Sequence, residues 1–157
     1  MLDLGKLDLD EIVLARDDGE YYEHRWLIDP LTGEIVFWTS DGGIDGQSPV
    51  DLDELDHLVS IEQEPSYVRY RDMAEFAEGI SDRRAGERLE RAIEGKGAFR
   101  RFRDALHQRY PELVPGWRAF SESRGRRRAV DWLAERELIE ASAAERFLDE
   151  HPDPELP

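Results

Sequence analysis

Residues 21–38, with the sequence YYEHRWLIDPLTGEIVFW, decide the fold of this chain. Two aromatic, β-rich segments, residues 21–28 and 34–38, lie on either side of Asp-Pro-Leu-Thr-Gly at residues 29–33. Proline sets φ at the start of a turn, and glycine supplies the positive φ that ends it. The stretch therefore predicts a β-hairpin.

Shorter elements are predicted around this hairpin. Residues 8–17 are typical of a short helix with acidic side chains at its start, where the helix dipole favours them. Residues 40–49 are rich in glycine and aspartate and predict an exposed loop. A third strand is expected near residues 57–62. Trp26 and Trp38 lie on facing hairpin strands, and we expect them to pair across the sheet.

From residue 67 the apolar residues recur with a helical period. In the first helix, Tyr70 and Met73 lie on the predicted apolar face, and Phe76 lies at its margin. Ser81 and Asp82 are expected to cap a second helix that ends at Gly95. Three further segments are predicted to be helical: residues 97–109 with Phe99, Phe102 and Leu106 inward, one long or two short helices around residues 117–133, and residues 144–148.

The order of these elements predicts an α+β fold, because strands come first and helices follow without alternation. We expect an N-terminal antiparallel sheet built on the β-hairpin, followed by four or five helices. Residues 1–150 are predicted to form a single α+β domain, and residues 151–157 a disordered tail.

Composition excludes several classes of protein. The chain of 157 residues has no cysteine, which excludes disulfides, thiolate zinc sites and a cysteine nucleophile. It has no apolar run near the roughly 20 residues that a membrane span needs. The first residues, Met-Leu-Asp-Leu-Gly-Lys, do not resemble a secretory signal. We therefore expect a cytoplasmic protein without a membrane partner.

The net charge of −16 is unevenly distributed. Residues 1–80 hold 5 basic and 21 acidic side chains, whereas residues 81–157 hold 16 of each. Within the second half, residues 96–128 hold 10 basic and 3 acidic side chains. The acidity either keeps the protein soluble or attracts a basic partner, and the arginines either pair with these acids or bind a ligand.

The first candidate binding surface is residues 95–103, with the sequence GKGAFRRFR. Glycines allow backbone N–H groups to approach a ligand, and the start of a helix favours anions. The segment is not a phosphate-binding P-loop, because the first glycine and the hydroxyl of that motif are missing. Its candidate anion- or partner-binding residues are Lys96, Arg100, Arg101 and Arg103. The alternative is a plain connector between two helices.

The second candidate surface is the cluster Arg126, Arg127 and Arg128. The forked guanidinium group suits phosphates and carboxylates. Basic side chains at the start of a helix oppose its dipole, which is a small indication of function. The alternative is a solvated basic face.

No catalytic or metal-binding pattern is evident. The four histidines lack metal-ligand spacing, and the acids in residues 41–54 fail the calcium-loop pattern. We predict no cofactor, no metal and no catalytic residues, although an unfamiliar active site would leave no motif.

Three segments carry a resemblance to a known family: DPLTGEIV at residues 29–36, YVRYRDM at residues 67–73, and LERAIEGKGAFRRFRD at residues 89–104. A downstream pattern extends it, formed by Trp117, Phe120, Ala129, Trp132 and Leu133. The chain resembles uncharacterised protein family 0158 over residues 7–140. This resemblance implies a small bacterial cytoplasmic protein. It implies no activity and no site residues.

Two functions are compatible with these observations. The first is a non-enzymatic binding or regulatory module, in which acids such as Asp51, Asp53 and Glu54 face a basic protein partner. The alternative is a nucleic-acid- or phosphate-binding protein, acting through Lys96, Arg100, Arg103, Arg126, Arg127 and Arg128. The overall acidity disfavours nucleic acid. The sequence carries no indication of oligomeric state.

Overall fold

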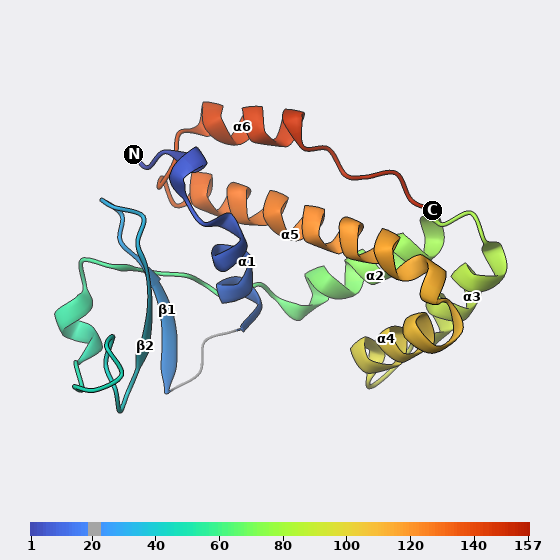
Figure 1. Ribbon diagram of the computed structural model, residues 1–157, viewed down its shortest axis with the longest axis horizontal. Coiled ribbons are helices and arrows are strands. Elements are labelled where there is room, and N and C mark those ends of the chain that lie inside the picture. Colours follow the sequence, from blue (N-terminus) through green and yellow to red (C-terminus); the bar gives the residue numbers. More distant parts are fainter. Residues whose placement is uncertain (19–22) are drawn as a thin grey trace. The chain divides into compact units, whose positions relative to one another are not determined.

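The computed structural model describes residues 1–18 and 23–157 (Figure 1). A three-stranded antiparallel sheet lies in the N-terminal part of the chain and helices follow it, so the predicted α+β class is confirmed. The chain divides into two compact units. Unit 1 comprises Met1–Glu64 and Arg126–Glu150, and unit 2 comprises Pro65–Gly125 and His151–Pro157. The grouping of residues 1–150 into a single domain stays a prediction.

The sheet of unit 1 contains β1 (His24–Ile28), β2 (Ile35–Thr39) and β3 (Val59–Ser60) in the order β2-β1-β3. The predicted hairpin is confirmed as β1 and β2; Tyr21 and Tyr22, predicted to open its first strand, lie outside the described residues. Asp29 stabilises the turn, because its carboxylate accepts a 2.8 Å hydrogen bond from the amide of Leu31.

The predicted pairing of Trp26 with Trp38 is wrong. The turn sets a register in which Trp26 faces Phe37 and Trp38 faces Arg25. Since successive side chains of a strand point to opposite faces, the two tryptophans lie on different sides of the sheet. The centres of the Trp26 and Phe37 rings lie 4.8 Å apart, whereas Trp38 is buried with Leu27.

Helices and shorter segments lie beside the sheet in the described part of unit 1. They are η1 (Leu4–Lys6), α1 (Leu9–Asp18), η2 (Leu52–Leu55), the C-terminal part of α5 (Val114–Glu135) and α6 (Ala141–Glu150), with residues 136–140 between the last two. In Figure 1, α6 runs beside this part of α5. The core of the unit is formed by Ile12, Ala15, Ile28, Ile61, Ala129, Val130, Trp132, Leu133, Leu138, Ile139 and Ala144.

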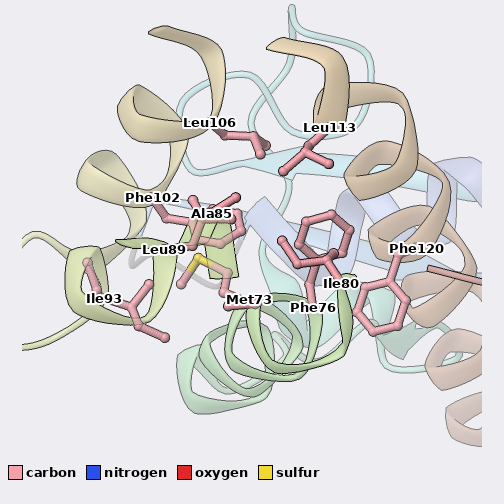
Figure 2. Close-up of a cluster of buried hydrophobic side chains, with 12 residues drawn as sticks. Met73, Phe76, Ile80, Ala85, Leu89, Ile93, Phe102, Leu106, Leu113 and Phe120 are labelled. Carbon is pink, nitrogen blue, oxygen red and sulfur yellow. The ribbon is translucent and has the colours of Figure 1, made fainter. Parts of the chain in front are cut away.

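Unit 2 is helical and contains α2 (Ser66–Gly79), α3 (Arg83–Ala92), α4 (Ala98–Arg109), η3 (Pro111–Leu113) and the N-terminal part of α5. The predicted cap of α3 is confirmed, since the Asp82 carboxylate accepts a hydrogen bond from the Ala85 amide. Figure 2 shows the side chains of this core converging from all four helices. Each large aliphatic side chain buried there contributes roughly 1.5–3 kcal/mol to the hydrophobic stabilisation.

Two predicted helix faces differ from the structure. Phe76, expected at the margin of α2, is fully buried at the centre of the core, whereas Tyr70 is 40% exposed. Phe99, expected to face inward, is 42% exposed. The inward positions of α4 are Ala98, Phe102 and Leu106, spaced by four residues. Phe99 lies about 100° around the helix from Ala98, so its ring points away from the core.

The last residues of the chain contact unit 2. The carbonyl oxygen of Pro157 accepts hydrogen bonds from the amide and the hydroxyl of Ser81, at 2.8 and 2.9 Å. Leu156 packs against the core of unit 2, and Asp153 accepts a hydrogen bond from Ser123. These contacts attach a segment for which composition predicts disorder.

Candidate functional site

The three arginines of the second predicted surface belong to unit 1, where each has a partner. Arg126 Nε lies 2.8 Å from a carboxylate oxygen of Asp10. Arg127 donates a 2.8 Å hydrogen bond to the carbonyl oxygen of Leu148 in α6. Arg128 forms an ion pair with Glu64. All three side chains are therefore engaged within the unit.

The pair formed by Arg128 and Glu64 is the most buried of these contacts. Glu64 is 7% exposed, and Arg128 donates from Nε to one carboxylate oxygen and from Nη2 to the other. Arg16 Nη1 lies 3.9 Å from the same carboxylate, so two guanidinium groups surround one buried acid. Burial lowers the pKa of Arg16, and the negative charge of Glu64 opposes this effect. An arginine stays protonated in proteins, so the network remains charged.

Arg124 has an equivalent structural role in unit 2. Its guanidinium group lies 2.6 Å from Glu75, 2.7 Å from Asp153 and 3.5 Å from the buried Asp72. Burial acts to lower the pKa of Arg124, but the hydrogen bonds to Asp153 and Glu75 outweigh it, and the pKa is raised. The guanidinium group also lies 4.7 Å from the centre of the Phe120 ring.

Arg101, from the first predicted surface, caps α3. Its Nε donates a 2.8 Å hydrogen bond to the carbonyl oxygen of Ala92, and its Nη2 donates to that of Glu94. Ala92 is the last residue of α3, so its carbonyl group lacks an intrahelical partner, and Glu94 lies just beyond the end of the helix. Arg101 therefore joins the start of α4 to the end of α3.

The other basic side chains of the first surface, Lys96, Arg100 and Arg103, are exposed. Lys96 lies between Gly95 and Gly97, whose φ angles are +77° and +75°. Gly97 is the N-cap of α4 and makes no side-chain cap, since it has no side chain. A Cβ atom at Gly97 would meet nothing within 4 Å, so the backbone at the start of α4 is open to a ligand.

A groove of about 520 Å³ lies beside this helix start, between the first turns of α2 and α4. It is lined by Ser66, Tyr67, Tyr70, Gly95, Gly97, Ala98, Phe99 and Arg100. Its aromatic side chains are exposed, to 61% for Tyr67, 40% for Tyr70 and 42% for Phe99. We call this feature the aromatic groove.

Two further arginines extend over the aromatic side chains. The guanidinium group of Arg69 lies 5.2 Å from the centre of the Phe99 ring, and that of Arg71 lies 5.6 Å from that of Tyr67. Such cation–π contacts hold positive charge beside a flat apolar surface. The side of the groove that α2 forms, with Tyr67 and Tyr70, was not predicted from the sequence. The alternation of aromatic and basic residues in YVRYR, residues 67–71, was the available signal.

The predicted site residues belong to different units: Lys96, Arg100, Arg101 and Arg103 to unit 2, and Arg126, Arg127 and Arg128 to unit 1. Arg100 lines the aromatic groove, Lys96 lies in the turn that borders it, and Arg103 lies one turn further along α4. Across residues 1–18 and 23–157, no three histidine or acidic side chains are grouped so that they could hold a metal ion. In the same residues, no helix has both the length and the apolar character needed to cross a membrane.

The fold and this groove define the chain as an α+β protein with an open aromatic and basic surface on its helical unit. It belongs to the uncharacterised protein family UPF0158, whose model matches residues 1–153. The UPF0158 protein PA5073 of Pseudomonas aeruginosa is 22% identical over 136 residues, which cover 87% of this chain and 86% of that protein. No solved structure matches the chain.

Proposed function

We propose that this chain is a non-enzymatic binding module whose aromatic groove takes a single-stranded nucleic acid. The observation that carries the proposal is the gathering of three exposed aromatic side chains and Arg100 around one groove. Exposed aromatic groups beside cations are the usual means by which proteins bind single strands without reading their sequence.

Each part of the groove has a chemical counterpart in such a ligand. Tyr67, Tyr70 and Phe99 offer flat faces on which bases stack, worth roughly 1–3 kcal/mol per base. Arg100 and Lys96 supply positive charge for the phosphates. The first N–H groups of α4 lack intrahelical partners and can donate to a phosphate oxygen.

The charge of each unit supports a short binding site confined to unit 2. Unit 2 holds 13 basic and 12 acidic side chains, a net charge of +1, whereas unit 1 holds 8 and 25, a net charge of −17. Unit 1 therefore repels a polyanion, whereas unit 2 does not. We therefore expect few phosphate contacts and moderate affinity.

The test is fluorescence anisotropy with labelled single-stranded RNA and DNA of about 12 nucleotides, from about 50 to 200 mM salt. We expect saturable binding that weakens with salt. Its logarithmic slope should be near −2, because each phosphate contact on a single strand contributes about −0.7 and the groove has about three exposed cations. A duplex of the same length should bind more weakly, since its bases are not free to stack.

Paired variants separate stacking from charge. The double variant Tyr67→Ala and Phe99→Ala should weaken binding at least about tenfold without changing the salt slope, because two stacking faces are lost. Lys96→Gln with Arg100→Gln should weaken binding and flatten the slope. Arg109→Gln with Arg118→Gln is the matched control, since both arginines are exposed in unit 2 and neither lines the groove. The proposal fails if no binding occurs at the lowest salt, or if the control loses as much affinity.

A basic protein partner of unit 1 is the second candidate function. The net charge of −17 favours it. The absence of cysteine leads us to propose the cytoplasm, a reducing compartment, as the site of either function.

A further inference from the structure

Strand β2 of unit 1 forms an edge of the described sheet, because the strand order is β2-β1-β3. The Thr39 amide donates a 3.0 Å hydrogen bond to the carbonyl oxygen of Gly43, and the Gly43 amide donates one of 2.9 Å to that of Thr39. The backbone groups of Thr39 therefore point away from β1.

The direction of the Thr39 backbone N–H and C=O groups determines the direction of these groups in the other residues of β2. In an antiparallel pair, the N–H and C=O groups of successive residues point alternately toward the partner strand and away from it. Ile35 and Phe37 therefore point their backbone groups to the same outer side as Thr39. Within the described part of the chain, no strand pairs with β2 on that side beyond the bridge to Gly43.

An apolar groove of about 470 Å³ follows this outer edge. It is lined by Glu34, Ile35, Val36, Phe37, Thr39, Gly43, Ile44 and Gly46. Phe37 is 40% exposed and Ile44 is 47% exposed. Natural proteins usually protect an apolar strand edge with lysine, proline or a covering segment. Residues 35–39, Ile-Val-Phe-Trp-Thr, contain neither lysine nor proline.

Three acidic residues line this groove or adjoin the residues that line it. Glu34 lines the groove, and Asp41 and Asp45 lie in the loop that supplies Gly43, Ile44 and Gly46. Hydrogen bonds from the amides of Ser48 and Gln47 lower the pKa of the Asp45 carboxyl group, so it is ionised at neutral pH.

We infer that the outer edge of β2 binds an extended, basic segment of another protein by strand addition. The open backbone groups of Ile35 and Phe37 provide main-chain hydrogen bonds, and the exposed Phe37 and Ile44 provide apolar contacts for alternate side chains. Glu34, Asp41 and Asp45, which we call the acidic rim, favour basic residues between the apolar residues of the bound segment. A second copy of this chain is a poor occupant, because its own acidic edge would face the same carboxylates.

The probe for this inference is a fluorescent peptide of about eight alternating lysine and valine residues, a typical strand length. We expect it to bind with one-to-one stoichiometry. Amide hydrogen exchange, read by NMR, should slow at least about tenfold at Ile35 and Phe37, because their N–H groups gain acceptors. The amide of Val36, which already faces β1, is the internal reference.

A peptide of the same sequence with every backbone nitrogen methylated is the control, because it keeps the charge and loses the donors. Equal binding of the two peptides would mean that charge alone attracts them, and would overturn the inference. Unchanged exchange at Ile35 and Phe37 in the presence of saturating peptide would overturn it as well.

Charge-neutralising variants test the acidic rim. Glu34→Gln, Asp41→Asn and Asp45→Asn together should weaken the peptide at least about tenfold. The asparagine at position 45 keeps an oxygen that accepts the Gln47 and Ser48 amides, so the loop is retained. The matched control is Glu145→Gln, Asp149→Asn and Glu150→Gln on α6, which makes the same charge change away from the groove. An equal loss in both variants would contradict the inference, as would a dimer of this chain in sedimentation that the peptide cannot displace.

Discussion

Arg128 and Arg100 both belong to arginine-rich segments of the sequence, but their surroundings in the structure differ. Arg128 holds a buried carboxylate with two hydrogen bonds, whereas Arg100 lines an open groove. A buried ion pair adds little net stability, because desolvation offsets the attraction, but the loss of one partner leaves a charge without compensation. The partners of each side chain therefore separate structural arginines from those available to a ligand.

Replacement of Arg128 by methionine should lower the free energy of unfolding by about 3 kcal/mol, because the buried Glu64 would lose both hydrogen bonds from Arg128 and keep the more distant Arg16. Urea unfolding followed by circular dichroism measures the change. Arg126→Met should cost less than about 1 kcal/mol, since that pair is exposed. The double variant Arg128→Met and Glu64→Leu should recover most of the loss. An Arg128→Met protein as stable as the parent would show that the pair is not structural.

The sequence identified these basic residues but not their partners. Arg128 and Glu64 are separated by 64 positions, and no local pattern connects them. The aromatic side of the groove was missed for a related reason. Tyr70 and Phe99 fit a helical period as core residues, and only the packing of the other helices leaves their rings exposed.

At the scale of elements, the turn between β1 and β2 depends on a charged side chain. The Asp29 carboxylate accepts hydrogen bonds from the amides of Leu31 and Thr32, and these lower its pKa. A carboxyl group with a lowered pKa stabilises the folded state above its unfolded pKa, about 3.9 for aspartate. That contribution is lost as the pH falls through the lower folded value.

We expect the carboxyl carbon of Asp29 to titrate below the midpoint of the same residue in a short peptide of residues 27–35. Amide exchange at Leu31 should accelerate, relative to that of the peptide at each pH, over the same acidic range, because its acceptor is being protonated. Both are read by NMR. A midpoint equal to that of the peptide would rule out the hydrogen bonds as the stabilising feature of the turn.

Individual helices, strands and turns are the features that the sequence predicts best. The hairpin, the cap of α3 and the helical order follow from turn residues and periodicity, which act over a few positions. Two details do not follow from such patterns. The exact geometry of the turn decides that Trp26 faces Phe37 and not Trp38. The packing of the other helices decides that Phe76 is central to its core.

At the scale of the whole molecule, almost all of the excess charge belongs to unit 1. Raising the salt concentration from about 10 to 100 mM shortens the screening length from about 30 to 10 Å and weakens the repulsion among its acids. Amide exchange should therefore slow more at Ile28 and Leu133, in the core of unit 1, than at Phe76 and Leu106 in that of unit 2. An equal or greater slowing of exchange in unit 2 would contradict the claim that repulsion among its acids destabilises unit 1.

The most direct test of the aromatic groove is two-dimensional amide NMR of the whole chain during titration with a single-stranded oligonucleotide. We predict that shifts concentrate in two segments, residues 66–71 and 95–103, and that Arg126, Arg127 and Arg128 do not respond. Shifts confined to other segments, or no shifts at low salt, would contradict the account.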